Sequence, residues 1–338
     1  MPNEEAKSIK VLSIDGGGIR GIIPAIILDA LQQRVGKEPW QTFDLIAGTS
    51  TGGIITVGIG TACNNGKPYS SQELVGMYVK NGQTIFKKSF FEAEKEILFP
   101  KYSPDGLQTV LERFFGDTQF DTAFTPLLVS SYDLQTQMPF FFKSHKISKD
   151  SSYNWPIQQI ARATSAAPTF FPPFHLVRDG QDYALVDGGV FVNNPAMAAY
   201  VEARRLYPDV KNVVVVSVGT GDRKDNITYA QAKDWGLLGW AKRIVPVLMD
   251  SVSEAVDYEL GSMPECTYYR LQVPNLLQDA ADMDNVTPEN IANLQQIAKD
   301  YLADPSTAAL LQTISAALQS GRGSDMPGIG PKGREATA

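Results

Sequence analysis

The sequence predicts an α/β protein in which a mostly parallel sheet is covered by helices on both faces. Short apolar runs that suit buried strands alternate with longer runs that suit helices along most of the 338 residues. The run KNVVVVSV at 211–218 is the clearest example of a strand buried on both sides. Strands that alternate with helices form parallel sheets between helical layers.

Each element is predicted from its own pattern. The expected strands are 9–14, 43–47, 126–133, 138–143, 183–186, 211–218 and 267–273. The expected helices are 22–35, 52–62, 155–166 and 195–207, with mostly helical stretches at 71–115, 230–262 and 288–319. Pro195 suits the first turn of its helix, where the missing N–H has no partner. We expect one domain over residues 1–319, followed by a disordered tail at 320–338 that is rich in glycine and charge.

Composition excludes several classes of function. The net charge of −7 and the absence of a long basic cluster argue against nucleic-acid binding and against strong attraction to anionic membranes. Apolar contact with lipid stays open. Cys63 and Cys266 form neither a metal pattern nor a disulfide framework, and we expect both to be small buried residues. Without a signal region or an apolar run of membrane-spanning length, a soluble cytoplasmic protein is expected.

The segment DGGGIRG, at 15–21, joins the first strand to the first helix and contains the pattern G-x-G-x-x-G. This pattern is found where dinucleotides bind, but by itself it is weak. A dinucleotide site also needs an acidic residue at the end of the second strand, and Asp44 stands at the opposite end of that strand. The alternative is that the backbone N–H groups of the loop bind an oxyanion.

The segment GTSTG, at 48–52, has the pattern G-x-S-x-G between a strand and a helix. This is the setting of a nucleophilic serine on a sharp turn, where Gly48 and Gly52 let neighbouring backbone pass closely. The helix that follows directs free N–H groups and positive potential toward Ser50. A packing turn rich in glycine and serine is the competing interpretation.

A nucleophilic serine needs a base. Of the two histidines in the chain, His145 lies among lysines and is expected to be a solvated loop residue, and His175 follows a Pro-Pro pair. A triad of Ser50, Asp133 and His175 would keep the order serine, acid, histidine that α/β hydrolases have. It is disfavoured because His175 follows a Pro-Pro loop rather than a late strand. Asp187, at the end of a strand and before two glycines, is the better candidate, although it is also compatible with a structural turn.

Taken together, three motifs in order resemble the patatin-like phospholipases. They are DGGGIRG (15–21), GTSTG (48–52) and DGG (187–189), and the connecting stretches ARATSAAPTFFPPF (161–174) and VVSVGTG (215–221) are similar as well. The resemblance covers roughly residues 9–222, and 223–319 carry no recognisable motif. It implies a three-layer α/β/α fold and hydrolysis of lipid acyl esters by a serine–aspartate dyad without metal or cofactor.

Carried over to this chain, the resemblance makes Ser50 the nucleophile and Asp187 its base. Gly16, Gly17 and Gly18 become the oxyanion loop, and Arg20 occupies the family's basic position beside it. We expect Asp187 to be desolvated and within hydrogen-bonding distance of Ser50, because burial makes a carboxylate more basic.

The expected partner is a phospholipid or another acyl-ester lipid, with transient contact to a membrane surface. Aromatic segments at 86–99, 138–142 and 170–174 are candidates for an apolar groove or a membrane-facing rim, with ordinary core as the alternative. The same acyl-serine would also serve an acyltransferase, and some family members are storage proteins. Whether a cyclic nucleotide or host factor activates the protein is not evident from the sequence.

Overall fold

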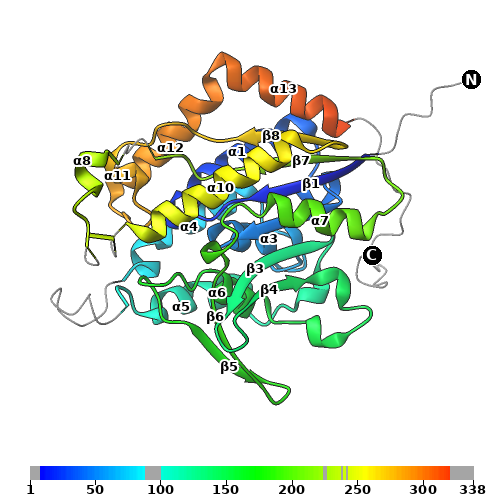
Figure 1. Cartoon of the computed structure of the whole chain (residues 1–338). Coiled ribbons are helices and arrows are strands. Elements are labelled where there is room, and N and C mark those ends of the chain that lie inside the picture. The colour runs from blue at the N-terminus through cyan, green and yellow to red at the C-terminus, as the bar shows by residue number, and fades with distance from the viewer. Residues whose placement is uncertain (1–7, 88–99, 224–226, 237–238, 241–242, 320–338) are drawn as a thin grey trace, which may run out of the picture.

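An eight-stranded mixed sheet forms the middle layer of the structure, a computed structural model that describes residues 8–87, 100–223, 227–236, 239–240 and 243–319 (Figure 1). The strands are β1 (Ser8–Ile14), β2 (Leu45–Thr49), β3 (Leu127–Asp133), β4 (Met138–Lys143), β5 (Phe174–Arg178), β6 (Gln181–Asp187), β7 (Asn212–Val218) and β8 (Cys266–Leu271). Their order is β5-β6-β3-β2-β1-β7-β8, and β4 pairs with β3 outside this path. The five strands β3, β2, β1, β7 and β8 run parallel, which confirms the predicted class.

Strand β3 has one partner along one of its edges and two partners along the other. The first edge pairs with antiparallel β4 along its length. The other edge pairs first with β2, up to Thr49 opposite Ser130, and then with antiparallel β6, starting from Asp187 opposite Ser131. The end of β2 and the end of β6 therefore face adjacent residues of the same strand, only one strand step apart.

Helices cover both faces of the sheet (Figure 1). They are α1 (Ile22–Val35), α2 (Pro39–Thr42), α3 (Thr51–Gly60), α4 (Ser71–Ile85), α5 (Pro104–Phe115), α6 (Ile157–Thr164), α7 (Ala196–Leu206), α8 (Tyr229–Ala232), α10 (Ile244–Ser262), α11 (Gln278–Ala281), α12 (Pro288–Ala303) and α13 (Pro305–Gln319). Alternate residues of β1 enter different cores: Leu12 and Ile14 pack with the side of α1, α3 and α4, and Ile9 and Val11 pack with α7 and α10. This alternation follows from the period of two along a strand.

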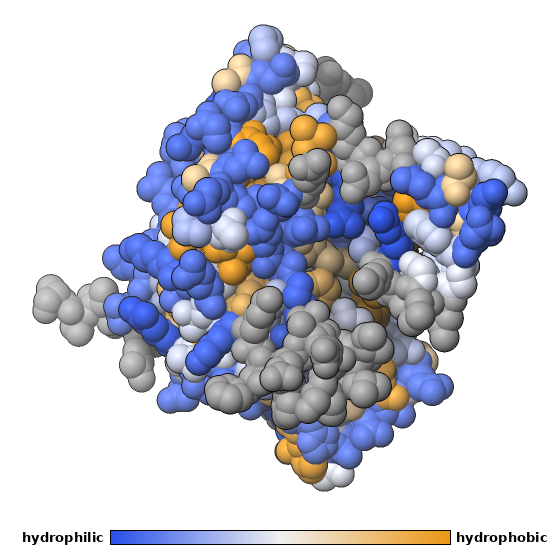
Figure 2. Space-filling view, turned by 90° about the vertical axis from the view of Figure 1, so that its left-hand side faces the viewer, coloured by the Kyte–Doolittle hydropathy of each residue, from blue (hydrophilic) through white to orange (hydrophobic). Residues whose placement is uncertain are grey.

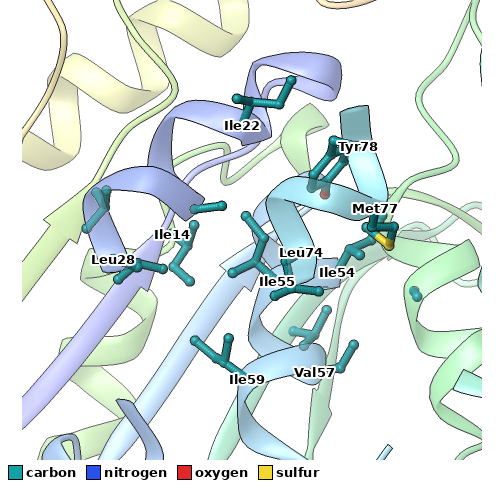
Figure 3. Packing of buried hydrophobic residues seen from close by; sticks show 14 of the residues in the cluster. Ile14, Ile22, Leu28, Ile54, Ile55, Val57, Ile59, Leu74, Met77 and Tyr78 are labelled. Carbon is teal, nitrogen blue, oxygen red and sulfur yellow. The ribbon is translucent and has the colours of Figure 1, made fainter. Parts of the chain in front are cut away.

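The larger core is built from branched aliphatic side chains. Figure 3 shows Ile14 of β1, Ile22 and Leu28 of α1, Ile55 of α3 and Leu74 of α4 packed around one another. All five are 0–1% exposed. Helix α3 is apolar around its whole circumference, and every residue from Thr51 to Gly60 is buried. A helix of this kind belongs in the interior, between the sheet and its neighbouring helices.

Most of the predicted elements are present; the short helices α2 and α11 were not predicted, the stretch 230–262 contains the separate helices α8 and α10, and there are further differences. The pattern at 288–319 is two helices, because Pro305 has no N–H to continue α12 and instead begins α13. Strand β5 was not predicted, and it forms a hairpin with β6. The stretch 71–115 contains the separate helices α4 and α5, while residues 88–99 between them lie outside the described part of the chain.

Two predictions about larger regions have no test here. The single domain over 1–319 stays a prediction, and the predicted tail at 320–338 lies outside the described residues. In the described part of the chain, no helix combines the length and apolar character needed to cross a membrane.

Gly52 marks the place where α3 crosses the end of β1. A Cβ at this position would lie 2.1 Å from the carbonyl oxygen of Ile14. We expect Gly52→Ala to lower the free energy of unfolding by about 2 kcal/mol or more, because backbone atoms must move. Gly76→Ala is the matched control: it lies inside α4 with no heavy atom within 4 Å, so alanine should raise stability by about 0.5–1 kcal/mol. Urea unfolding measures the stability of both variants. Equal stabilities would contradict the close approach of α3 to the end of β1 at Gly52.

Candidate active site

Ser50 occupies a strained turn between β2 and α3. Its backbone has φ 55° and ψ −124°, a conformation that residues other than glycine rarely adopt. Gly48 and Gly52 are required on either side: a Cβ at Gly48 would lie 2.2 Å from the carbonyl oxygen of Gly52. The serine backbone N–H donates to Thr164 Oγ1 at 2.9 Å, which helps to hold the turn. The predicted strand–turn–helix setting of the serine is therefore present.

Asp187 ends β6 and lies next to Ser50, as its position opposite Ser131 requires. The Ser50 hydroxyl lies close enough to the Asp187 carboxylate to lower its pKa as a hydrogen-bond donor would. The Asp187 backbone N–H donates to the Ala166 carbonyl at 3.0 Å, and its Oδ1 accepts from the Gly189 N–H at 2.7 Å. Burial raises the pKa of Asp187 to about 7, against the lowering effect of the Ser50 and Gly189 hydrogen bonds. Desolvation thus gives this carboxylate a proton affinity that suits a base near neutral pH.

The predicted glycine loop lies against Ser50. A Cβ at Gly16 would lie 3.2 Å from Ser50 Cβ and 2.5 Å from Asn193 Oδ1, so a larger residue there would have to displace the Asn193 side chain. The Gly16 N–H already donates to the Asn193 carbonyl at 3.1 Å, which removes it from the set of free donors. Among the described residues, the N–H groups of Gly17 and Gly18 have no assigned acceptor. These two N–H groups are therefore the donors of the loop that are available to bind an anion.

Arg20 lies behind this loop rather than inside the cavity that contains Ser50. Its guanidinium donates to the Gly221 carbonyl at 3.0 Å and is 3.4 Å from the Gly17 carbonyl. Arg20 lines a separate small polar cavity together with Asp15, Asp222 and other residues. These contacts help to hold the loop backbone in place, and a role for Arg20 in the oxyanion hole stays a prediction.

Neither histidine lies at the site. His175 is 64% exposed and pairs with Asp182 at 2.7 Å on the β5–β6 hairpin. The Asp133 carboxylate accepts a hydrogen bond from the Gln135 backbone N–H at 3.1 Å. The prediction that His145 is a solvated loop residue is wrong, since its side chain is 5% exposed and bonded to Glu202 at 2.8 Å.

A largely apolar cavity opens beside Ser50 and Asp187. Its lining includes Ile54, Ile85, Phe86, Leu107, Phe170, Phe171, Val190, Val245, Leu248, Met249 and Met283. Figure 2 views the end of the molecule toward which β1 and β7 run and shows apolar patches on this face among hydrophilic ones. The aromatic segment at 170–174 thus contributes to a groove as predicted. The segment at 138–142 does not, because Phe140 and Phe142 pack against Trp155 in the core.

Residues without a recognisable motif complete the site. Val245, Leu248 and Met249 of α10 line the cavity, and the Met283 carbonyl accepts from the Ile19 N–H at 2.8 Å behind the glycine loop. Single apolar residues on a helix give no signal in a sequence, so these could not be predicted. Within the part of the chain that the structure describes, no group of His, Cys, Asp and Glu side chains is arranged to hold a metal ion.

Comparison with known proteins gives a consistent result. A family model described as patatin-like phospholipase matches residues 12–200. Patatin-like protein 2 from Arabidopsis thaliana is 31% identical, covering 90% of this chain and 85% of that protein, and patatin group J-1 from Solanum tuberosum is 32% identical, covering 92% and 88%. The solved structure of human GIVD cytosolic phospholipase A2 aligns with a TM-score of 0.45 and 13% identity, over 94% of this chain and 61% of that one.

The strain at Ser50 has a measurable consequence. Ser50→Gly and Ser50→Ala both lose the hydroxyl, but only glycine adopts φ 55° without steric conflict. We expect Ser50→Gly to be more stable than Ser50→Ala by about 0.5–2 kcal/mol, after the larger chain entropy of glycine is included. Thermal or urea unfolding of the two variants measures the difference. A glycine variant less stable than the alanine variant would show that the turn is not strained.

The buried carboxylate predicts a pH dependence of stability. Because burial raises the folded-state pKa of Asp187 to about 7, the unfolded chain loses this proton first as pH rises. Its contribution to stability is then greatest below about pH 4 and declines until about pH 7. Asp187→Asn does not titrate, so its stability relative to wild type should increase by about 2 kcal/mol between pH 5 and pH 8. If the free energies of unfolding of wild type and Asp187→Asn changed equally with pH, the raised pKa of Asp187 would be contradicted.

Proposed function

Because the chain belongs to the patatin-like phospholipase family, we propose that it is a lipid acyl hydrolase in which Ser50 is the nucleophile and Asp187 its base. The observation that carries this assignment is that the Ser50 hydroxyl approaches the buried Asp187 carboxylate in the lining of an apolar cavity. Neither histidine takes part in it. The proposed enzyme is a serine esterase of the phospholipase A or lysophospholipase type.

In the proposed first step, Asp187 accepts the hydroxyl proton while Ser50 Oγ attacks the ester carbonyl carbon. The negative charge that develops on the carbonyl oxygen is stabilised by the Gly17 and Gly18 N–H groups. Removing one donor of this kind typically costs about 3 kcal/mol in the barrier. Asp187 then returns the proton to the alcohol oxygen as the C–O bond breaks, which leaves an acyl-Ser50.

Hydrolysis of the acyl-enzyme reverses these roles. Asp187 takes a proton from water, the hydroxide attacks the acyl carbon, and the fatty acid leaves as Ser50 regains its proton. The carboxylate must be ionised to act, so kcat/KM should rise with pH through about 7, the pKa to which burial raises Asp187.

The substrate would be a fatty-acyl ester whose chain enters the apolar cavity. Val190 and Leu248 line this cavity and are 40% and 48% exposed, which makes its mouth apolar. Such a mouth suits transient contact with a lipid surface, from which the acyl chain would pass into the cavity without crossing much water.

The proposal is tested with purified protein and mixed phospholipid vesicles, with products identified by mass spectrometry. We expect released fatty acid and lysolipid from wild type, labelling of Ser50 by a fluorophosphonate, and a loss of about 10⁴-fold or more in kcat for Ser50→Ala and Asp187→Asn. His175→Ala is the control and should keep full activity.

Other outcomes would exclude specific parts of the proposal. Full activity of Asp187→Asn together with loss in His175→Ala would establish a triad instead of a dyad. Products in which an added alcohol carries the acyl group, with little free fatty acid, would identify an acyltransferase. A wild-type protein that neither reacts with fluorophosphonate nor releases fatty acid would be non-catalytic.

A further inference from the structure

The polar side chains that line the apolar cavity are few, and four of them are paired. Ser50 interacts with Asp187, and Thr51 is hydrogen-bonded to Tyr78. Ser165 is the remaining polar side chain in the lining. Its residue is 8% exposed, and within the described residues its Oγ has no hydrogen-bond partner. Buried polar atoms are nearly always hydrogen-bonded, so an orphan hydroxyl in a binding cavity points to a ligand atom as its partner.

The backbone fixes Ser165 beside both reacting groups. The residue before it, Thr164, accepts the Ser50 N–H at 2.9 Å, and the residue after it, Ala166, accepts the Asp187 N–H at 3.0 Å. The Ser165 carbonyl accepts from Ala167 at 2.9 Å. These contacts hold the backbone of Ser165 next to Ser50 and Asp187, and rotation about its Cα–Cβ bond turns the hydroxyl toward the cavity.

Ser165 and the glycine loop approach Ser50 from different sides. The glycine loop follows β1, whereas the 164–166 segment packs against β3 and β6: a Cβ at Gly53 would meet Thr164 at 2.8 Å and Val129 of β3 at 2.9 Å. If the carbonyl oxygen of an ester binds the glycine amides, its alcohol oxygen must face Asp187 to receive the proton. Ser165 belongs to the segment whose Ala166 carbonyl accepts the Asp187 N–H, and we infer that its hydroxyl serves that side.

We propose that the Ser165 hydroxyl donates a hydrogen bond to the alcohol oxygen of the bound ester, and later to the water that replaces it. This rests on the proposed function, because it requires the Ser50 acyl-enzyme. In the tetrahedral intermediate the C–O bond to the alcohol breaks and its electron pair goes to the alcohol oxygen. Ser165 stabilises this charge while Asp187 delivers the proton, and Ser165 keeps its own. Water attacks where the alcohol departed, so the same donor contacts both.

This role makes Ser165 a determinant of which esters react. An alkyl alcohol such as glycerol is a poor leaving group and depends on a donor at its oxygen. The 4-nitrophenolate anion is stable and leaves without one. The site is thus suited to alkyl esters of the glycerol class, and loss of the hydroxyl should matter mainly for them.

The experiment compares two esters of the same acid, glyceryl monooctanoate and 4-nitrophenyl octanoate. Since kcat/KM reports on steps up to release of the alcohol, Ser165→Ala should lower it about 10- to 100-fold for the glyceryl ester and less than about 3-fold for the nitrophenyl ester. Ser165→Cys, with a weak S–H donor of similar size, should fall between wild type and alanine on the glyceryl ester.

Stability supplies a second readout. Removing a buried hydroxyl without a partner should leave the melting temperature of Ser165→Ala unchanged or raise it. Ser71→Ala is the matched control: Ser71 Oγ is also buried without a partner among the described residues, but it is not part of the cavity lining. It should keep both activities and an equal or higher melting temperature.

The outcomes separate this inference from the function on which it rests. An active wild type with Ser165→Ala equally impaired on both esters, or on neither, would overturn the role of Ser165 alone. A Ser165→Ala protein that melts well below wild type would do the same, because it would make the hydroxyl structural. A wild type inactive on both esters and unlabelled by fluorophosphonate would refute the proposed function.

Discussion

The site depends on one edge of strand β3, which is shared by two other strands. Strand β2 uses it as far as Ser130, opposite Thr49, and β6 uses it from Ser131, opposite Asp187. The side chains that follow β2 and end β6 are thereby brought together from opposite directions, although many elements separate them along the chain. The register of two ladders of backbone hydrogen bonds, rather than any contact between the two side chains, determines that they meet.

Two unfavourable features coincide at this point. Ser50 adopts a left-handed backbone, and Asp187 is a nearly inaccessible carboxylate with no cationic partner in the described part of the chain. Each lowers stability, yet together they place a hydroxyl beside a carboxylate of raised pKa. Such features persist only where surrounding structure is rigid, and here the all-buried helix α3 and the β1–β7 pairing supply that rigidity.

Most of the fold could be predicted because its signals are local. Periodicity and apolar runs predict nearly every strand and helix, and the glycines that flank Ser50 predict a tight turn. Strand β5 escaped detection since its alternating exposed and half-buried residues carry no strong apolar pattern. His145 was misjudged because the neighbouring lysines indicated solvent, whereas its partner Glu202 comes from a distant helix.

The sequence by itself determined the local chemistry: a serine at a strand–helix turn, a strand-ending aspartate, a glycine loop and too few histidines. Only the tertiary structure decided which amides of the loop stay free, that Arg20 donates to the Gly221 carbonyl, and that α10 and Met283 line the cavity. The hydroxyl of Ser165, which has no partner among the described residues, is likewise a feature that only the tertiary structure decided. Local patterns are set by neighbours in the chain, but free donors, orientation and burial depend on residues that are distant in sequence.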